Sequence, residues 1–206
     1  MESNTSEIFE KDRYILVKNA ISQDSINFIK DSLMYESLRY PNQTNDVIVP
    51  LTQTKYASPT TEALSVALLP TIENITGLSL FPTYSYYRIY KPGDYLTNHK
   101  DRNSCEISLT INLGFNYVNV DDGYTWDIFI NGKSFQTMPG DMIIYRGIEL
   151  EHYRDPMLGD PESWQLQAFL HYVNANGTYK DYIYDGRPGM GYNSDTKSLP
   201  TGRDYW

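Results

Sequence analysis

The sequence predicts a mainly β protein of the α+β class, with N-terminal helices packed on one face of a sheet. Apolar residues recur every three to four positions in two N-terminal segments, but after Pro82 the apolar pattern changes to every second residue. The alternating strands each have one apolar face and one more polar face. A jelly roll (double-stranded β-helix) with a lined central cavity requires strands of this kind.

The first part of the chain is expected to supply a strand and a helix. Residues 1–11 are polar and are expected to be frayed, whereas Arg13–Val17 is expected to form a strand. Ser22 and Asp24 are residue types that cap helix N-termini, and apolar side chains follow at helical spacing: Ile26, Ile29, Leu33 and Met34. This pattern predicts an amphipathic helix that lies on a sheet.

A loop and a second helix are expected next. Residues 39–59 contain several prolines and predict a long loop, in which Val47–Val49 is a candidate short strand. The apolar spacing after Thr61 predicts a second helix. This helix is expected to be interrupted at Pro70, because proline lacks an amide donor, and to end at Gly77.

Two later segments show the clearest alternation. In Glu106–Leu113 and in Trp164–Val173, apolar residues occupy one face, and the other face is more polar. Each segment is therefore expected to pack its apolar face on helices or on an opposing sheet, and to turn its other face toward a cavity. Asn131-Gly132 lies between two short strand-like runs and predicts a hairpin turn.

The chain is expected to form a single domain over residues 1–184. With 206 residues it is long enough to bury a core without metal or disulfide bonds. Residues 12–80 would form the helical support, and residues 81–175 would form the jelly-roll core. Residues 185–206 are rich in glycine, proline and polar side chains, and they are expected to form an extended or disordered tail.

Composition argues against several classes of partner. The net charge of −9 disfavours general binding to nucleic acid, which requires clustered lysine and arginine. No apolar run reaches the roughly 20 residues that span a bilayer, so no membrane partner is expected. Cys105 is the single cysteine and no signal-peptide core is recognisable, so we expect a cytoplasmic location. A monomer or homodimer is expected.

His99 and Asp101 form the centre of the most informative stretch. Residues two apart on an extended segment project to the same side, so an imidazole nitrogen and a carboxylate oxygen can converge on one cation. His152 closes a later strand-like run after a Pro139-Gly140 turn and is the candidate third ligand. Two histidines and one carboxylate, with the opposite positions open, are typical of non-haem Fe(II) oxygenases.

The sequence resembles the 2-oxoglutarate- and Fe(II)-dependent dioxygenases, in particular the prolyl-4-hydroxylase-like branch. The resemblance rests on His99-x-Asp101, on Tyr90-Lys-Pro-Gly-Asp nine residues before His99, and on His152 after a Pro-Gly-Asp turn. It covers about Asp12 to Val173. It implies a cupin-like jelly roll in which the two histidines and the aspartate bind Fe(II) and 2-oxoglutarate chelates the iron.

The sequence departs from the family pattern at the residue that pairs with the far carboxylate of 2-oxoglutarate. Family members carry a lysine or arginine shortly beyond the distal histidine, but Ser163 stands there in this chain. A buried dicarboxylate without a cationic or multi-donor partner would cost several kcal/mol. Arg88 is the leading substitute, because the family fold pairs its strand with the last strand. Arg154, two residues beyond His152, is the second candidate.

Other polar residues are candidates for the same co-substrate pocket. Tyr90 matches a family tyrosine that lines this pocket, and its hydroxyl can donate to a carboxylate. Gln167 and Asn112 fall on inward faces and are further candidate donors. His171 has no partner at a ligand spacing and is interpreted as a core or rim histidine, and Cys105 as a buried, inert thiol.

By this resemblance, the protein is expected to hydroxylate a C–H bond of an acceptor while 2-oxoglutarate is converted to succinate. A prolyl residue in a protein or peptide is slightly favoured as the acceptor, because the tyrosines at residues 84–95 and the loop 41–59 suit an extended peptide. The alternatives are a small-molecule or free amino-acid hydroxylase, and a cupin-like metal-binding protein without 2-oxoglutarate chemistry. Ascorbate is an additional candidate cofactor.

Overall fold

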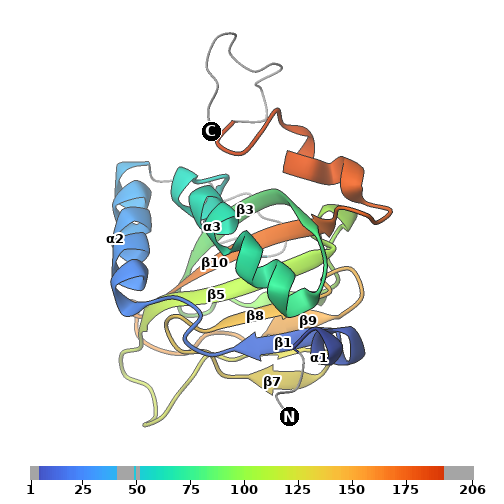
Figure 1. Ribbon diagram of the computed structural model, residues 1–206. Helices are drawn as coiled ribbons and strands as arrows, with labels where there is room; N and C mark the ends of the chain where they lie inside the picture. The colour runs from blue at the N-terminus through green and yellow to red at the C-terminus, as the bar shows by residue number, and fades with distance from the viewer. Residues whose placement is uncertain (1–4, 41–48, 50–51, 193–206) are drawn as a thin grey trace.

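The computed structural model describes residues 5–40, 49 and 52–192, and its strands form two antiparallel sheets (Figure 1). The larger sheet has the strand order β1-β8-β5-β10-β3-β2, and the smaller sheet has the order β4-β9-β6-β7. The strands are β1 (Tyr14–Val17), β2 (Gln53–Tyr56), β3 (Leu80–Tyr90), β4 (Leu96–His99), β5 (Ile107–Asn116), β6 (Ile128–Ile130), β7 (Lys133–Phe135), β8 (Met142–Tyr145), β9 (His152–Arg154) and β10 (Trp164–Asn174). The helices are α1 (Thr5–Asp12), α2 (Gln23–Arg39) and α3 (Pro59–Thr76), with 3-10 segments η1 (Asn103–Cys105) and η2 (Lys180–Gly186).

The main hydrophobic core lies between the larger sheet and the helices. Alternate residues of β5 and β10 contribute to it, as their sequence pattern predicted: Ile107, Leu109, Ile111, Leu113, Leu166, Ala168, Leu170 and Tyr172. α2 contacts β5, and α3 contacts β3 and β10, so the helices cover one face of this sheet (Figure 1). The opposite face carries buried polar side chains, including Ser108, Thr110 and Gln167. The predicted jelly-roll class, with helices on one sheet, is confirmed.

The N-terminal segment differs from the expectation of a frayed end. Residues 5–12 form helix α1, while residues 1–4 lie outside the described part of the chain. Phe9 of this helix is fully buried in the main core, and Glu10 pairs with Arg146 at 2.9 Å. One buried aromatic residue in a polar segment does not create a periodic pattern, so sequence analysis overlooked this helix.

Helix α3 continues through Pro70, although the sequence predicted an interruption there. A proline at this position leaves the carbonyl of Val66 without its helical hydrogen bond. Both Val66 and Pro70 face solvent, so water can satisfy that carbonyl. The helix ends as predicted at Gly77, whose φ of 70° is left-handed. No helix in the described residues combines the length and apolarity needed to cross a membrane.

Strand β2 lies within the range that was expected to be a long loop. It pairs with β3 and places Thr54 opposite Arg88 at the edge of the larger sheet. The expected short strand at residues 47–49 falls almost wholly outside the described residues, and Val49 itself is not in a strand. Two local predictions are confirmed. The Ser22 side chain caps α2, and Asn131-Gly132 turns between β6 and β7 with φ angles of 51° and 74°.

The first part of the expected tail is packed against the rest of the protein. Arg187 forms an ion pair of 2.6 Å with Glu62 of α3, and only 2% of each side chain is exposed. Asp185 accepts hydrogen bonds from the Tyr56 hydroxyl at 2.7 Å and from Arg102 at 2.9 Å. An extended or disordered tail is therefore wrong for residues 185–192, and residues 193–206 lie outside the described chain.

Candidate metal and co-substrate site

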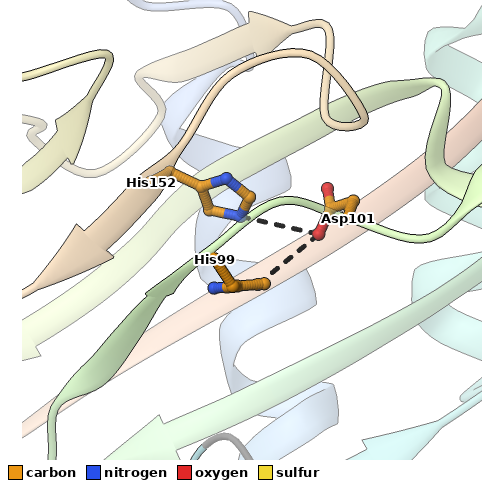
Figure 2. A group of neighbouring side chains, drawn as sticks. All are labelled: His99, Asp101 and His152. Atoms are coloured by element: carbon orange, nitrogen blue, oxygen red, sulfur yellow. Dashed lines mark ion pairs between the residues drawn. The ribbon is translucent and has the colours of Figure 1, made fainter.

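The pairing of β4 with β9 brings the candidate metal ligands together. His99 at the end of β4 lies opposite His152 at the start of β9, and Asp101 follows two residues after His99. Oδ1 of Asp101 lies 3.6 Å from Nε2 of His99 and 3.5 Å from Nε2 of His152 (Figure 2). One ligand atom from each of the three residues lies within 4.8 Å of the other two. These distances suit three donors around one ion.

Both histidines present the correct nitrogen to such an ion. Nδ1 of His99 lies 2.7 Å from the carbonyl oxygen of Thr97, and Nδ1 of His152 lies 3.1 Å from that of Leu150. A carbonyl oxygen only accepts, so each Nδ1 carries the proton and each Nε2 keeps a lone pair. Hydrogen bonds of this kind fix the tautomer and ring orientation of metal-binding histidines. The donor set therefore fits a divalent transition metal.

The electrostatics of the cluster favour an ionised aspartate. Burial acts to raise the pKa of Asp101, but the contacts with His152 and His99 outweigh burial and hold this pKa well below its usual range. Burial acts to lower the pKa of His99, but Asp101 and the Thr97 carbonyl outweigh it and raise this pKa. The carboxylate thus carries the negative charge that attracts a metal cation.

Ser108 and Gly147 surround the second oxygen of Asp101. The Ser108 hydroxyl donates to Oδ2 of Asp101 at 2.6 Å. A Cβ atom at Gly147 would overlap Oδ2 of Asp101 and would lie 2.5 Å from Oγ of Ser108. The Asp101 amide donates to the Gly147 carbonyl at 2.9 Å, which holds the two segments at this close approach. Sequence analysis missed both residues, because neither has a motif of its own.

A cavity of about 430 Å³ opens beside the metal ligands. Its lining combines aromatic, cationic and small polar side chains: Thr54, Tyr56, Tyr84, Tyr86, Arg88, His99, Lys100, Asp101, Arg102 and Cys105. The tyrosines form a stacked wall, with ring centres 5.3 Å apart for Tyr56 and Tyr84 and 6.0 Å apart for Tyr84 and Tyr86. The candidate metal site is thus reached through a partly aromatic cavity.

The leading candidate for the co-substrate carboxylate, Arg88, lines this cavity. Its strand β3 pairs with β10 as the sequence predicted, and Arg88 lies opposite Gln167. The guanidinium donates to the Tyr90 hydroxyl at 3.2 Å and lies over the Tyr86 ring, 4.9 Å from its centre. Tyr90 is fully buried, in edge contact with Trp126. Arg88 and Tyr90 are therefore adjacent, with Arg88 on the cavity side.

The two amide candidates already have protein partners. Gln167 donates to Thr110 at 2.7 Å and accepts from Gln165 at 2.9 Å. Asn112 donates to the Thr137 carbonyl at 2.8 Å and accepts from the Gly114 amide at 2.9 Å. Asn112 thus connects β5 to the turn before β8, and its amide group is used in that contact. Gln167 belongs to a buried chain of amides that continues through Gln165 to the hydroxyl of Tyr117.

The second candidate, Arg154, is the more unusual group. It is 1% exposed, its Nη1 donates to the Trp126 carbonyl at 2.6 Å, and burial lowers its pKa. Its Nε and Nη2 have no hydrogen-bond partner among the residues that the structure describes. Ser163, at the usual family position, instead binds the backbone of Val118. Buried guanidinium nitrogens without partners suit an anionic ligand, because leaving them unpaired is costly.

Comparisons with known proteins identify the fold. No protein-family model and no curated protein matches this chain. A prolyl-4-hydroxylase from Pseudomonas putida is 12% identical, with a TM-score of 0.63 over 84% of this chain and 99% of the other. HygX from Streptomyces hygroscopicus, solved with nickel, 2-oxoglutarate and hygromycin B, is 13% identical, with a TM-score of 0.64 over 87% of this chain and 90% of the other.

A third solved structure belongs to the same group of enzymes. The prolyl hydroxylase from Trichoplax adhaerens, in complex with a hypoxia inducible factor peptide fragment, is 10% identical, with a TM-score of 0.62 over 83% of this chain and 88% of the other. At such low identity, the likeness lies in the course of the backbone. The chain therefore has the fold of the 2-oxoglutarate- and Fe(II)-dependent oxygenases, which confirms at the level of the fold the resemblance found in its sequence.

Proposed function

We propose that the protein is an Fe(II)- and 2-oxoglutarate-dependent oxygenase that hydroxylates a C–H bond of an acceptor substrate. The observation that carries this proposal is the cluster of His99, Asp101 and His152, in which two Nε2 atoms and one carboxylate oxygen converge beside a cavity. Both Nδ1 atoms are already used by backbone carbonyls, so the Nε2 atoms are available to a metal. The fold, shared with oxygenases of this chemistry, supports the same assignment.

The residues of this chain would hold the reactants, and the bound cofactors would supply the oxidation. When bound, Fe(II) would supply the oxidising chemistry, in which 2-oxoglutarate and O2 give succinate and CO2, with one oxygen atom entering succinate and the other entering the C–H bond. His99, Asp101 and His152 would occupy one side of the metal and leave the other side open. The stacked rings of Tyr84 and Tyr86 form a wall that limits the water near these ligands. Ascorbate remains a candidate reductant for maintaining Fe(II).

For the far carboxylate of 2-oxoglutarate we propose Arg154 in place of Arg88. Arg154 lies two residues beyond His152 on β9, so both side chains project to the same face of the strand. Its two unpartnered nitrogens can form a paired contact with a carboxylate, the geometry that arginine prefers. Tyr90 and Arg154 both contact the Trp126 ring, Tyr90 in a T-shaped arrangement and Arg154 over its face. Because the two residues share this neighbour, the Tyr90 hydroxyl remains a candidate second donor to the same carboxylate.

A peptide prolyl residue remains the first candidate acceptor. The tyrosine wall of the cavity can hold a proline ring at low entropic cost, and one protein with this fold was solved with a peptide fragment. One observation favours a small molecule as the second candidate. Asp185 accepts hydrogen bonds from Tyr56 and Arg102, two residues of the cavity lining, and so ties these two side chains together beside the cavity. HygX, with hygromycin B bound, has the same fold.

A cytoplasmic location is part of the same proposal. Cys105 is a free, buried cysteine, and a reducing compartment keeps both a thiol and Fe(II) in their reduced forms. A monomer or homodimer is proposed, as the sequence suggested. The competing class, a cupin-like metal-binding protein, would bind the metal without consuming 2-oxoglutarate. Turnover measurements distinguish the two classes.

The experiment is to incubate the Fe(II)-loaded protein with 2-oxoglutarate and O2, and to measure succinate release with candidate acceptors. Proline-containing peptides and free amino acids are supplied in parallel, and product formation is followed as a mass gain of about 16 Da, one oxygen atom. We expect 2-oxoglutarate consumption that an acceptor stimulates. Asp101→Ala provides the matched inactive control. Iron binding without any consumption of 2-oxoglutarate would contradict the oxygenase assignment and favour the metal-binding alternative.

A further inference from the structure

We propose that His171 is a positioning residue that acts through Ser108 to orient the carboxylate of Asp101. This inference rests on the proposed metal site. In this arrangement Oδ1 of Asp101 faces both candidate histidine ligands, while Oδ2 is held by the Ser108 hydroxyl at 2.6 Å. Ser108 in turn lies 3.0 Å from Nδ1 of His171. The three side chains form one hydrogen-bonded chain that ends at the metal position.

The direction of each hydrogen bond follows from the number of protons. The Ser108 hydroxyl has a single proton, and at 2.6 Å from Oδ2 of Asp101 it donates that proton to the carboxylate. Oγ of Ser108 must then accept from His171, so Nδ1 of His171 carries a proton. The Cys105 carbonyl, 3.2 Å from the same Oγ, is a longer contact to an atom that only accepts. His171 is thereby assigned as a donor to Ser108.

The strand pairing holds the hydrogen-bonded chain of Asp101, Ser108 and His171, called the brace below, in a fixed position. Ser108 of β5 and His171 of β10 are direct neighbours in the register of the larger sheet, and both are buried. The His171 ring packs against two tyrosines of the cavity wall, with its centre 4.6 Å from that of Tyr84 and 5.5 Å from that of Tyr86. Gly147 also lies against this group, because a Cβ atom at Gly147 would collide with Oδ2 of Asp101. These neighbours surround the Ser108 hydroxyl on both strands.

The remaining nitrogen of His171 indicates that the residue is not a simple core histidine. Its Nε2 is buried and has no hydrogen-bond partner in the part of the chain that the structure describes. Burying a polar atom without a partner destabilises a protein. An apolar side chain of similar size would avoid this cost but would not donate to Ser108. The contact with Ser108 therefore gives a physical reason for a histidine at this position.

The brace has a consequence for metal binding. A carboxylate can bind a metal through one oxygen or through both. With Oδ2 held by Ser108, Asp101 would hold a metal through Oδ1 alone, which would leave more of the shell for the co-substrate and O2. Without the brace, Oδ2 is free to turn toward the metal. We therefore expect the brace to affect both the affinity of the site for a metal and the number of coordination positions that Asp101 leaves open.

The test is to titrate Co(II), an air-stable substitute for Fe(II), into the metal-free protein and to record both affinity and the visible absorption of bound Co(II). Ser108→Ala and His171→Leu should weaken Co(II) binding about 10–100-fold, the usual effect of removing a residue that orients a ligand. They should also change the Co(II) absorption spectrum. His171→Asn should keep the affinity near that of the wild type, because its amide nitrogen can occupy the position of Nδ1.

Ser65→Ala is the matched control, because Ser65 is buried and donates to the Glu62 carbonyl at 2.8 Å in α3, on a different element from the ligands. Its Co(II) affinity and spectrum should equal those of the wild type. Ser108→Ala removes one oxygen atom and tests the contact between Ser108 and Asp101 by itself. If His171→Leu does not fold, His171→Phe, which keeps a ring but cannot donate, tests the role of His171 in its place.

Three outcomes would overturn the inference. If wild type and Ser108→Ala bind Co(II) with equal affinity and give equal spectra, the brace does not orient Asp101, although the metal-site assignment still stands. If Ser108→Ala binds Co(II) more weakly but His171→Leu binds it as the wild type does, His171 has no role in orienting Asp101. A wild-type protein that binds no Co(II) would overturn the metal site itself, together with the brace.

Discussion

The guanidinium of Arg154 lies 4.6 Å from the centre of the Trp126 ring and donates to the carbonyl of the same residue, while its Nε and Nη2 lack partners among the described residues. Trp126 therefore fixes the plane of the guanidinium and leaves two donors directed elsewhere. An arginine held in this way is ready to receive a planar anion such as a carboxylate. This relationship moves the proposed co-substrate anchor from Arg88 to Arg154.

The first prediction concerns this anchor. Arg154→Met should raise the KM for 2-oxoglutarate by one to three orders of magnitude, because removing one partner of a buried charge pair costs about 2–5 kcal/mol. Metal binding should persist, since the three ligands are intact. Steady-state kinetics with varied 2-oxoglutarate provides the measurement. Arg88→Met is the comparison: a large rise in KM there, with none in Arg154→Met, would return the role to Arg88.

The second prediction concerns the metal ligands. Asp101→Ala should abolish stable iron binding and turnover, because the carboxylate is the only charged donor of the three and lies between both histidines. Metal analysis after dialysis against Fe(II) under anaerobic conditions measures this loss. Asp122→Ala, at an exposed position, is the control and should retain its metal. An Asp101→Ala protein with full metal content and activity would refute the ligand assignment.

A third prediction concerns Gly147. Gly147→Ala should weaken metal binding, because the added Cβ atom would force Asp101 or Ser108 out of its present position. Gly189→Ala is a suitable control, since a Cβ there would meet only ordinary contacts, 3.5 Å from Tyr192. Co(II) titration of both variants provides the comparison. Equal affinities would show that the loop holding Gly147 can shift without disturbing the ligands.

The fourth prediction concerns the packed C-terminal segment. Arg187→Met should destabilise the protein by about 3–5 kcal/mol, because it leaves the Glu62 carboxylate buried without its partner. Arg187→Met combined with Glu62→Gln should recover part of this loss, since no buried charge remains. Urea unfolding of the single and double variants gives the free energies. A single variant as stable as the wild type would mean that the segment contributes little to folding.

The sequence was sufficient for features that depend on local patterns. Alternation in β5 and β10 reflects a two-sided environment, so it predicted both strands and their faces. The turn at Asn131-Gly132 and the cap at Gly77 follow from residue types that tolerate positive φ. His99 and Asp101 are two residues apart, so their convergence needed only an extended backbone. His152 needed the family resemblance, because the pairing of β4 with β9 is not a local property.

Features that depend on partners distant in sequence were not predictable. Arg187 and Asp185 are polar, and their packing depends on Glu62, Tyr56 and Arg102, which hydrophobic periodicity does not identify. The choice of Arg154 over Arg88 depended on the two buried Arg154 nitrogens, Nε and Nη2, that have no hydrogen-bond partner among the described residues, and no pattern along the chain contains that information. The helix α1 was missed for a similar reason, because a single residue, Phe9, anchors it in the core.

The most direct test of the oxygenase assignment is the visible spectrum of the anaerobic Fe(II) protein before and after 2-oxoglutarate is added. Chelation of Fe(II) by the keto acid produces a weak charge-transfer band, and the band requires both the metal and the co-substrate in one site. We predict that this band appears with the wild-type protein, needs a higher 2-oxoglutarate concentration with Arg154→Met, and is absent with Asp101→Ala. A wild-type protein that binds Fe(II) and shows no band at saturating 2-oxoglutarate would contradict the account.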